Sequence, residues 1–223
     1  MKQLALDIIA PAAPSFDNFV AGPNSWLVAR LRALALPHSL DLIYLWGGQG
    51  SGRTHLLHAT AQAARSANRP VVWAAAESGR VDLSASPGAL VLADDIERLD
   101  ETGQIALFRA FNTASMVGLA MLLAGCEPPL RQNVREDLRT RLGAMLVFEL
   151  KPLSDEEKAQ TLLRHAHGRG LRVGRDVIDY LLRHGRRDLP ALLGVLDALD
   201  RACLERKRPV TVPLLREILR PSE

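Results

Sequence analysis

A run of eight residues, Gly47–Thr54, constrains this chain more than any other part of its sequence. The run reads GGQGSGRT and fits the pattern G-x-x-x-x-G-[K/R]-[ST], in which glycine-rich backbone curls around phosphate oxygens. The apolar run Asp41–Trp46 comes directly before it, and a helical pattern over Thr54–Ser66 follows. A loop that joins a buried strand to a helix N-terminus also gains the partial positive charge of that terminus. The sequence therefore predicts a phosphate-binding loop within an α/β fold.

Strands and helices alternate along the chain as far as Pro152. Such alternation predicts a five-stranded parallel sheet with helices on both faces, and right-handed crossovers narrow it to a doubly wound topology. We expect strands at Asp41–Trp46, Val71–Ala75, Leu90–Ala93, Leu119–Leu123 and Met145–Leu150. We expect one helix to start after Asn24-Ser25, which can cap it, and to run to about Leu36. Further helices are expected at Thr54–Ser66 and Ile105–Ala114.

After Pro152 only helical patterns remain, and they predict a small all-helical domain. The expected helices are Ser154–His167, Asp176–Arg183, Asp188–Glu205 and Val212–Leu219. The chain thus divides into a tail and linker (1–14), an α/β nucleotide-binding domain (15–152) and a helical lid domain (153–223).

The composition, 48% hydrophobic and 24% charged over 223 residues, is typical of a soluble globular protein. No apolar run reaches the ~18 residues that span a bilayer, so we expect no membrane association. Cys126 and Cys203 lie far apart without metal-ligand spacing, which favours reduced thiols and a cytoplasmic location. Residues 131–223 hold 19 Lys/Arg and 14 Asp/Glu, a net charge of +5. Their interleaving favours a solvated helical surface over a contact with nucleic acid or an acidic protein.

The phosphate loop supplies most of the candidate nucleotide-binding residues. Arg53 stands where lysine is usual in such loops and keeps the positive charge, and Thr54 can place its hydroxyl on Mg²⁺. A metal site at His55 and His58 is disfavoured, because no third ligand follows. The candidate nucleotide-binding residues here are Gly47, Gly48, Gln49, Gly50, Ser51, Gly52, Arg53, Thr54 and His55.

A second signal is the apolar run Leu90–Ala93, which ends in Asp94 and Asp95. An acidic residue at a strand end can hold Mg²⁺ through its water shell, so Asp94 is the second candidate metal residue beside Thr54. Asp95 would orient or activate the attacking water. Alone, two aspartates after a strand could be a turn cap; after a phosphate loop, the functional interpretation is favoured.

Six segments, taken together, resemble the AAA+ ATPases of the DnaA family over residues 15–219. They are the opening motif Ser15–Asn24, the Walker A segment Gly47–His58, the Walker B segment Ala93–Ile96, the sensor I loop at Pro128-Pro129, the arginine-finger segment Asp137–Leu142 and the sensor II segment Gly185–Leu189.

This resemblance implies a P-loop NTPase with an all-helical lid that binds ADP or ATP with Mg²⁺. It also implies that Arg187 reaches the nucleotide from the lid. Arg141 would act in trans as the arginine finger, with Arg139 and Arg135 nearby. A surface helix is the alternative interpretation for Arg141, and a helix-start arginine is the alternative for Arg187.

The tail adds a further resemblance, to the short peptides that bind the DNA polymerase sliding clamp. The residues that carry it are Gln3, Leu4, Leu6, Asp7 and Ile8. The chain begins and ends without the oligomerisation and helix-turn-helix domains of the initiator. It therefore resembles the family's regulators, which dock on the DNA-loaded clamp and stimulate hydrolysis of ATP held by DnaA. The implied partners are DnaA, the clamp and, through the clamp, DNA; a homo-oligomer is left open.

Two departures from the family pattern predict weak or no intrinsic ATPase activity. One is Arg53, and the other is Gly125-Cys126 where a polar sensor I residue is usual. ADP and ATP stay open as the resting ligand. The alternative function is a DNA-acting AAA+ ATPase, such as a helicase loader or an initiator-like protein, which would bind DNA directly and in a salt-sensitive way. A small-molecule kinase is disfavoured by the helical lid.

Overall fold

A computed structural model describes residues 13–74, 87–186, 188–206 and 208–219 of the chain. Two groups of candidate residues lie outside the described residues. One is Arg187, and the other is the clamp-binding set Gln3, Leu4, Leu6, Asp7 and Ile8.

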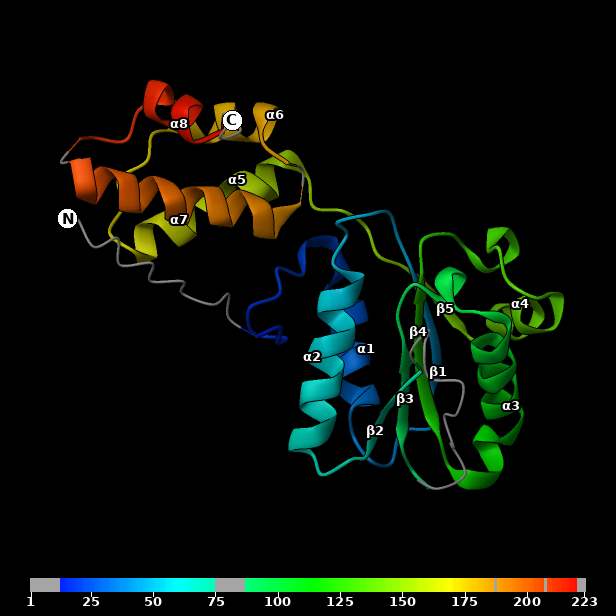
Figure 1. The fold of residues 1–223 in the computed structure, drawn as a ribbon. Helices are drawn as coiled ribbons and strands as arrows, with labels where there is room; N and C mark the ends of the chain where they lie inside the picture. The colour runs from blue at the N-terminus through cyan, green and yellow to red at the C-terminus, as the bar shows by residue number, and fades with distance from the viewer. Residues whose placement is uncertain (1–12, 75–86, 187, 207, 220–223) are drawn as a thin grey trace, which may run out of the picture.

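The centre of the first domain is a sheet of five parallel strands, as the sequence predicts, and their order is β2-β3-β4-β1-β5 (Figure 1). The strands are β1 (Leu42–Trp46), β2 (Val71–Trp73), β3 (Leu90–Ala93), β4 (Ala120–Gly125) and β5 (Leu146–Glu149). Every residue of β3 and β4 is buried, because a parallel sheet carries helices on both faces.

Helices α1 (Ser25–Leu34) and α2 (Arg53–Ser66) cover one face of the sheet, and α3 (Glu101–Val117) and α4 (Glu136–Gly143) cover the other (Figure 1). The period of two along each strand divides the core accordingly. Ile43 and Leu45 of β1 pack on the side of α1 and α2, whereas Tyr44 packs on the side of α3 and α4. Helix α4, a short segment rich in charged residues, is not among the expected helices, although a surface helix was the alternative interpretation for Arg141.

Helix α1 begins at Ser25, one residue earlier than expected, and ends at Leu34, two residues earlier than expected. The expected cap is wrong. The side chain of Asn24 accepts no hydrogen bond from the first turn of α1. Its Nδ2 donates to the Lys151 carbonyl at 2.8 Å, and its Oδ1 accepts from the Lys151 amide at 2.9 Å. Asn24 thus ties the start of the domain to the segment that follows β5. Trp26 is 70% exposed, and its ring centroid lies 5.1 Å from that of Phe148.

A buried arginine fastens α1 to the amino end of β3. Arg69 is 2% exposed, and all of its recorded side-chain partners are backbone carbonyls. Its guanidinium donates to Gly88 at 2.9 Å, Leu34 at 2.8 Å, Leu36 at 2.7 Å and Ser39 at 2.8 Å. The Leu34 carbonyl ends α1, where helix carbonyls lack intrahelical donors, and the Leu36 carbonyl follows shortly after it. Burial without a carboxylate lowers the pKa of Arg69.

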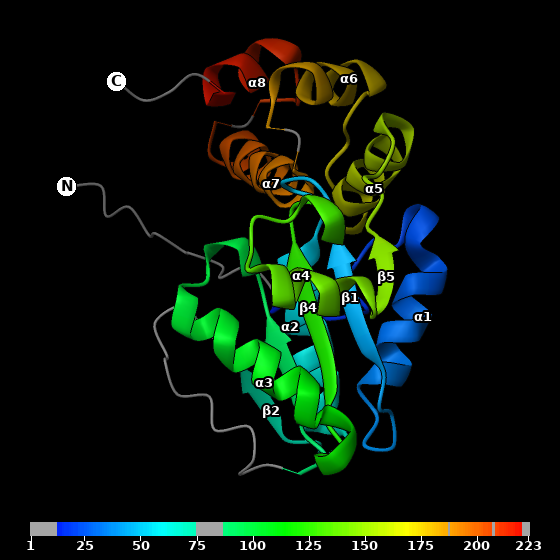
Figure 2. The same cartoon turned by 90° about the vertical axis from the view of Figure 1, so that its right-hand side faces the viewer.

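The second domain is a four-helix lid with its own apolar core of leucine, isoleucine and valine. Its helices are α5 (Asp155–Gly168), α6 (Arg175–His184), α7 (Leu189–Arg206) and α8 (Val212–Leu219). Helix α5 starts with a capping box between Ser154 and Glu157. The lid lies above the carboxyl ends of the strands (Figure 2). None of the described helices is long and apolar enough to cross a membrane.

Candidate nucleotide site

The predicted phosphate loop connects β1 to α2 at the edge of the sheet that faces the lid (Figure 2). Gly50 and Gly52 have φ angles of +75° and +103°, a region that favours glycine. A Cβ at Gly52 would lie 2.9 Å from the Phe19 ring, and a Cβ at Gly50 would lie 3.1 Å from Asp188 of the lid. No side chain caps the first turn of α2, so its amide groups are available to an anion.

The two carboxylates that follow β3 lie against the two polar residues that begin α2. The Thr54 hydroxyl donates to Asp94 Oδ2 at 2.5 Å, and Arg53 Nη2 donates to Asp95 Oδ1 at 3.0 Å. The Arg53 side chain is only 12% exposed, and the Asp95 side chain is 36% exposed. Asp95 also has a φ of +42°, which is unusual outside glycine. The Walker A and Walker B segments of the sequence are therefore in direct contact.

The charge of Asp95 is unfavourable in this position. Burial and the adjacent Asp94 carboxylate raise the pKa of Asp95, and the Arg53 guanidinium opposes that rise. A perturbed carboxyl beside a phosphate loop is typical of a functional site. While Arg53 holds Asp95, however, the Asp95 Oδ1 atom is engaged in an ion pair.

Unpartnered polar atoms at the loop test whether a nucleotide fits. Among the described residues, Ser51 Oγ, Arg53 Nη1 and Glu97 Oε2 are buried without a hydrogen-bond partner. The Ser51 hydroxyl and the Arg53 Nη1–H group, beside the free amides of the helix N-terminus, are hydrogen-bond donors of the kind that phosphate oxygens accept from. Thr54 and Asp94 offer the oxygen ligands that Mg²⁺ prefers, and Mg²⁺ usually keeps several waters besides. No group of three His, Cys, Asp or Glu side chains suited to a metal occurs in the described part of the chain. The residues present fit a nucleotide with Mg²⁺.

Beyond β4, a hydrogen-bond network occupies the space that a sensor I side chain would need. A Cβ at Gly125 would collide with Gln132 Nε2 and the Tyr44 hydroxyl. Tyr44 donates to the Glu127 carbonyl at 2.6 Å and accepts from Gln132 at 2.6 Å. Burial raises the pKa of Tyr44. This pair was not predicted from the sequence; the one signal for it is a tyrosine hydroxyl inside an apolar strand, which needs a hydrogen-bond partner.

Cys126 lies next to this network. Its backbone amide donates to Glu97 Oε1 at 3.2 Å. A hydrogen bond with Glu97 and burial raise the pKa of the Cys126 thiol. A neutral thiol is a weak donor, so this position offers little to a phosphate group.

His55 lies beneath the segment that opens the domain. Its Nε2 is 2.9 Å from the Ser15 carbonyl, and its ring is 5.4 Å from the Phe19 ring. Since Phe19 also contacts the phosphate loop at Gly52, His55 and Phe19 together hold the opening segment against that loop.

Arg135, which precedes the finger segment, and Arg141, which lies within it, differ in their partners. Arg135 pairs with Glu101 at 2.9 Å and with Asp137 at 3.1 Å, so its charge is compensated. Arg141 has no carboxylate partner among the described residues. Its guanidinium lies 5.6 Å from the centre of the Phe108 ring and 5.2 Å from that of the Phe111 ring, and both rings belong to α3.

Comparisons with known proteins agree with this arrangement. The sequence profile of the bacterial DnaA ATPase domain matches residues 12–86, and the profile of the Hda lid domain matches residues 155–219. Domain III of the Thermotoga maritima replication initiation protein DnaA is similar, with 20% identity and a TM-score of 0.73 over 94% of this chain and 98% of that one.

Two further solved structures share the fold. AMPPCP-bound DnaA from Aquifex aeolicus has 22% identity and a TM-score of 0.71, covering 87% of this chain and 68% of that one. A variant of Thermotoga maritima RuvB has 18% identity and a TM-score of 0.69, covering 92% and 71%. At these identities the structural likeness establishes the AAA+ fold.

Proposed function

The chain belongs to the Hda/DnaA family of AAA+ proteins, and from this premise we propose that it regulates the initiation of DNA replication. The observation that carries the proposal is the order of the two profile matches. A DnaA-type ATPase segment at 12–86 is followed by an Hda-type lid at 155–219. The finer proposal is a nucleotide-bound adaptor that docks on the DNA-loaded sliding clamp and stimulates hydrolysis of ATP held by DnaA.

The proposed ligand is ADP or ATP with Mg²⁺. Bound ATP would supply the phosphoanhydride bond, and Mg²⁺ would neutralise charge on its phosphates. In this chain, the amides of the loop, Ser51 and Arg53 would bind phosphate oxygens, while Thr54 and Asp94 would hold the metal. The AMPPCP-bound relative supports a nucleotide of this class.

Weak intrinsic hydrolysis follows from the pairing of Arg53 with Asp95. While Nη2 of Arg53 is held by Asp95, only its buried, unpartnered Nη1 is left to donate to a phosphate. Asp95 can orient water only when it is free of Arg53. A planar guanidinium shared between Asp95 and a phosphate binds each of them less well than a compact ammonium would bind the phosphate alone. We therefore propose that this chain binds nucleotide more readily than it hydrolyses it.

Arg141 is the proposed arginine finger, offered to a nucleotide bound by DnaA. It is the arginine of its helix that is held over aromatic rings without a carboxylate partner in the described residues. Stacking pre-orders the long side chain and leaves the charge uncompensated. A finger supplied in trans stabilises transition-state charge and accelerates hydrolysis by ~10³–10⁵ in GTPase systems. The clamp contact rests on the tail pattern alone, with Gln3, Leu4, Leu6, Asp7 and Ile8 as its residues.

The test is single-turnover hydrolysis of ATP held by purified DnaA. The chain is added with and without DNA-loaded clamp, beside an Arg141→Ala variant, a variant lacking residues 3–8 and a matched Arg139→Ala control. We expect clamp-dependent acceleration that both of the first two variants abolish and the control keeps. Retained acceleration in Arg141→Ala would remove the finger assignment.

The alternative function makes a different prediction. A helicase loader or initiator-like ATPase would bind DNA without the clamp, and its affinity would fall steeply with salt. Absence of both acceleration and clamp binding, together with salt-sensitive DNA binding, would favour that alternative.

A further inference from the structure

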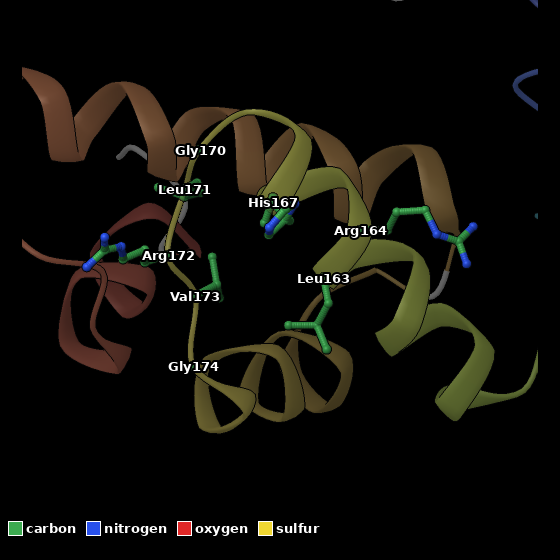
Figure 3. Close-up of a pocket in the computed structure, with 9 residues that line it drawn as sticks. Leu163, Arg164, His167, Gly170, Leu171, Arg172, Val173 and Gly174 are labelled. Atoms are coloured by element: carbon green, nitrogen blue, oxygen red, sulfur yellow. The ribbon is translucent and has the colours of Figure 1, made fainter.

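The lid carries a surface groove of about 860 Å³ on the side of α5. The end of α5 and the segment between α5 and α6 form it, and Figure 3 shows the residues that line it. This volume is within the ~300–1,000 Å³ of typical ligand pockets. The groove belongs to neither the phosphate loop nor the finger segment.

Both charged side chains that line the groove are arginines. Arg164, His167 and Arg172 line it, and no acidic residue does. In the view of Figure 3, His167 lies between the two arginines. Neither arginine has an ion pair or a side-chain hydrogen bond with any described residue. By contrast, Arg169 and Arg175 of the same domain each pair with two carboxylates. Two unpaired guanidinium groups at one groove favour an anionic ligand.

The floor of the groove is apolar. Leu163, Leu171 and Val173 are half-buried there, and Leu163 and Val173 also pack against the apolar core of the lid. Gly170 and Gly174 contribute no side chains, and Gly170 has a φ of +74°. The ligand therefore meets apolar surface between positive charges.

We propose that this groove binds an acidic, amphipathic peptide segment of a partner protein. In an extended peptide, alternate side chains point to opposite sides, so apolar residues can contact the floor while carboxylates reach Arg164 and Arg172. A nucleic acid fits less well, because protein–DNA interfaces are more polar and much more positively charged. This inference does not depend on the role in replication proposed above.

Fluorescence anisotropy of the full chain with a labelled peptide tests the proposal. The peptide is about eight residues long and alternates leucine with glutamate, matching the period of two of an extended chain. We expect saturable binding that the Arg164→Glu, Arg172→Glu double variant weakens at least about tenfold, with loss of affinity as salt rises. Arg183→Glu, on the exposed side of α6, is the matched control and should bind like the parent chain. The double Arg→Gln variant removes the charges without reversing them, and thermal melting checks that each variant folds.

Three results would overturn the proposal. The first is equal binding of a peptide that alternates leucine with lysine. The second is the same loss of affinity in Arg183→Glu and in the double variants. The third is tighter, arginine-dependent binding of a single-stranded oligodeoxynucleotide than of the acidic peptide, which would assign the groove to DNA.

Discussion

Replacing Arg69 with methionine would remove four hydrogen bonds from the interior while keeping the apolar stem of the side chain. The four acceptors are carbonyls that lie 2.7–2.9 Å from the guanidinium nitrogens, and they join α1 and the loop after it to the start of β3. Methionine cannot donate to any of them.

The magnitude follows from the count of bonds. Each lost bond costs ~1 kcal/mol net, so four cost ~4 kcal/mol, and relief of the buried guanidinium charge offsets part of this. We expect the free energy of unfolding to fall by ~3–4 kcal/mol, a decrease of roughly 6–16 °C in Tm for a chain of this size. The free energy of unfolding of Arg69→Lys should lie between that of the parent chain and that of Arg69→Met, because an ammonium with three donors cannot donate to all four carbonyls.

Urea unfolding followed by circular dichroism measures the change, and thermal melting checks it. Arg65→Met is the matched control, because Arg65 is exposed near the end of α2 and should tolerate the substitution within ~0.5 kcal/mol. A loss below ~1 kcal/mol in Arg69→Met, with no change in slope against urea, would refute the reasoning that these carbonyls depend on Arg69.

Three further predictions concern the site and its supports. Arg53→Lys should release Asp95 and raise intrinsic ATP hydrolysis at least about tenfold in a phosphate-release assay; an unchanged rate would show that the ion pair does not limit hydrolysis. Gly125→Ala should push against the Tyr44 hydroxyl and lower the unfolding free energy by ~1–3 kcal/mol, which urea titration measures; full stability would contradict the collision. Hydrogen bonds from Ser154 lower the pKa of Glu157, so its stabilising effect is present above its ordinary pKa and is lost as pH falls through the lowered value. Glu157→Gln should therefore be less stable than the parent at pH 7, and the difference should vanish once the pH is well below the lowered pKa of Glu157. A pH-independent difference would exclude the charge as the cause.

Local sequence patterns were sufficient to predict most of the architecture. The apolar run Leu90–Ala93 is β3 with the bounds predicted, and the phosphate loop lies between β1 and α2 as expected. The helix Val212–Leu219 also has the predicted bounds. These elements can be predicted from sequence because the hydrophobic period, the turn residues and the burial that define them depend on a few neighbouring residues. Helix α4 was missed, because its sequence EDLRTRLG has only two buried apolar positions.

The sequence by itself determined the parallel α/β sheet, the glycine loop with its basic and hydroxyl residues, the carboxylates after β3 and the helical lid. Only the tertiary structure decided which of these groups contact one another. It pairs Arg53 with Asp95, and it joins Asn24 to Lys151 across 127 residues. It also brings Arg164 and Arg172 to one groove. The physical reason is that a side chain's partner is chosen by packing between distant segments, and no periodic pattern along the chain records that choice.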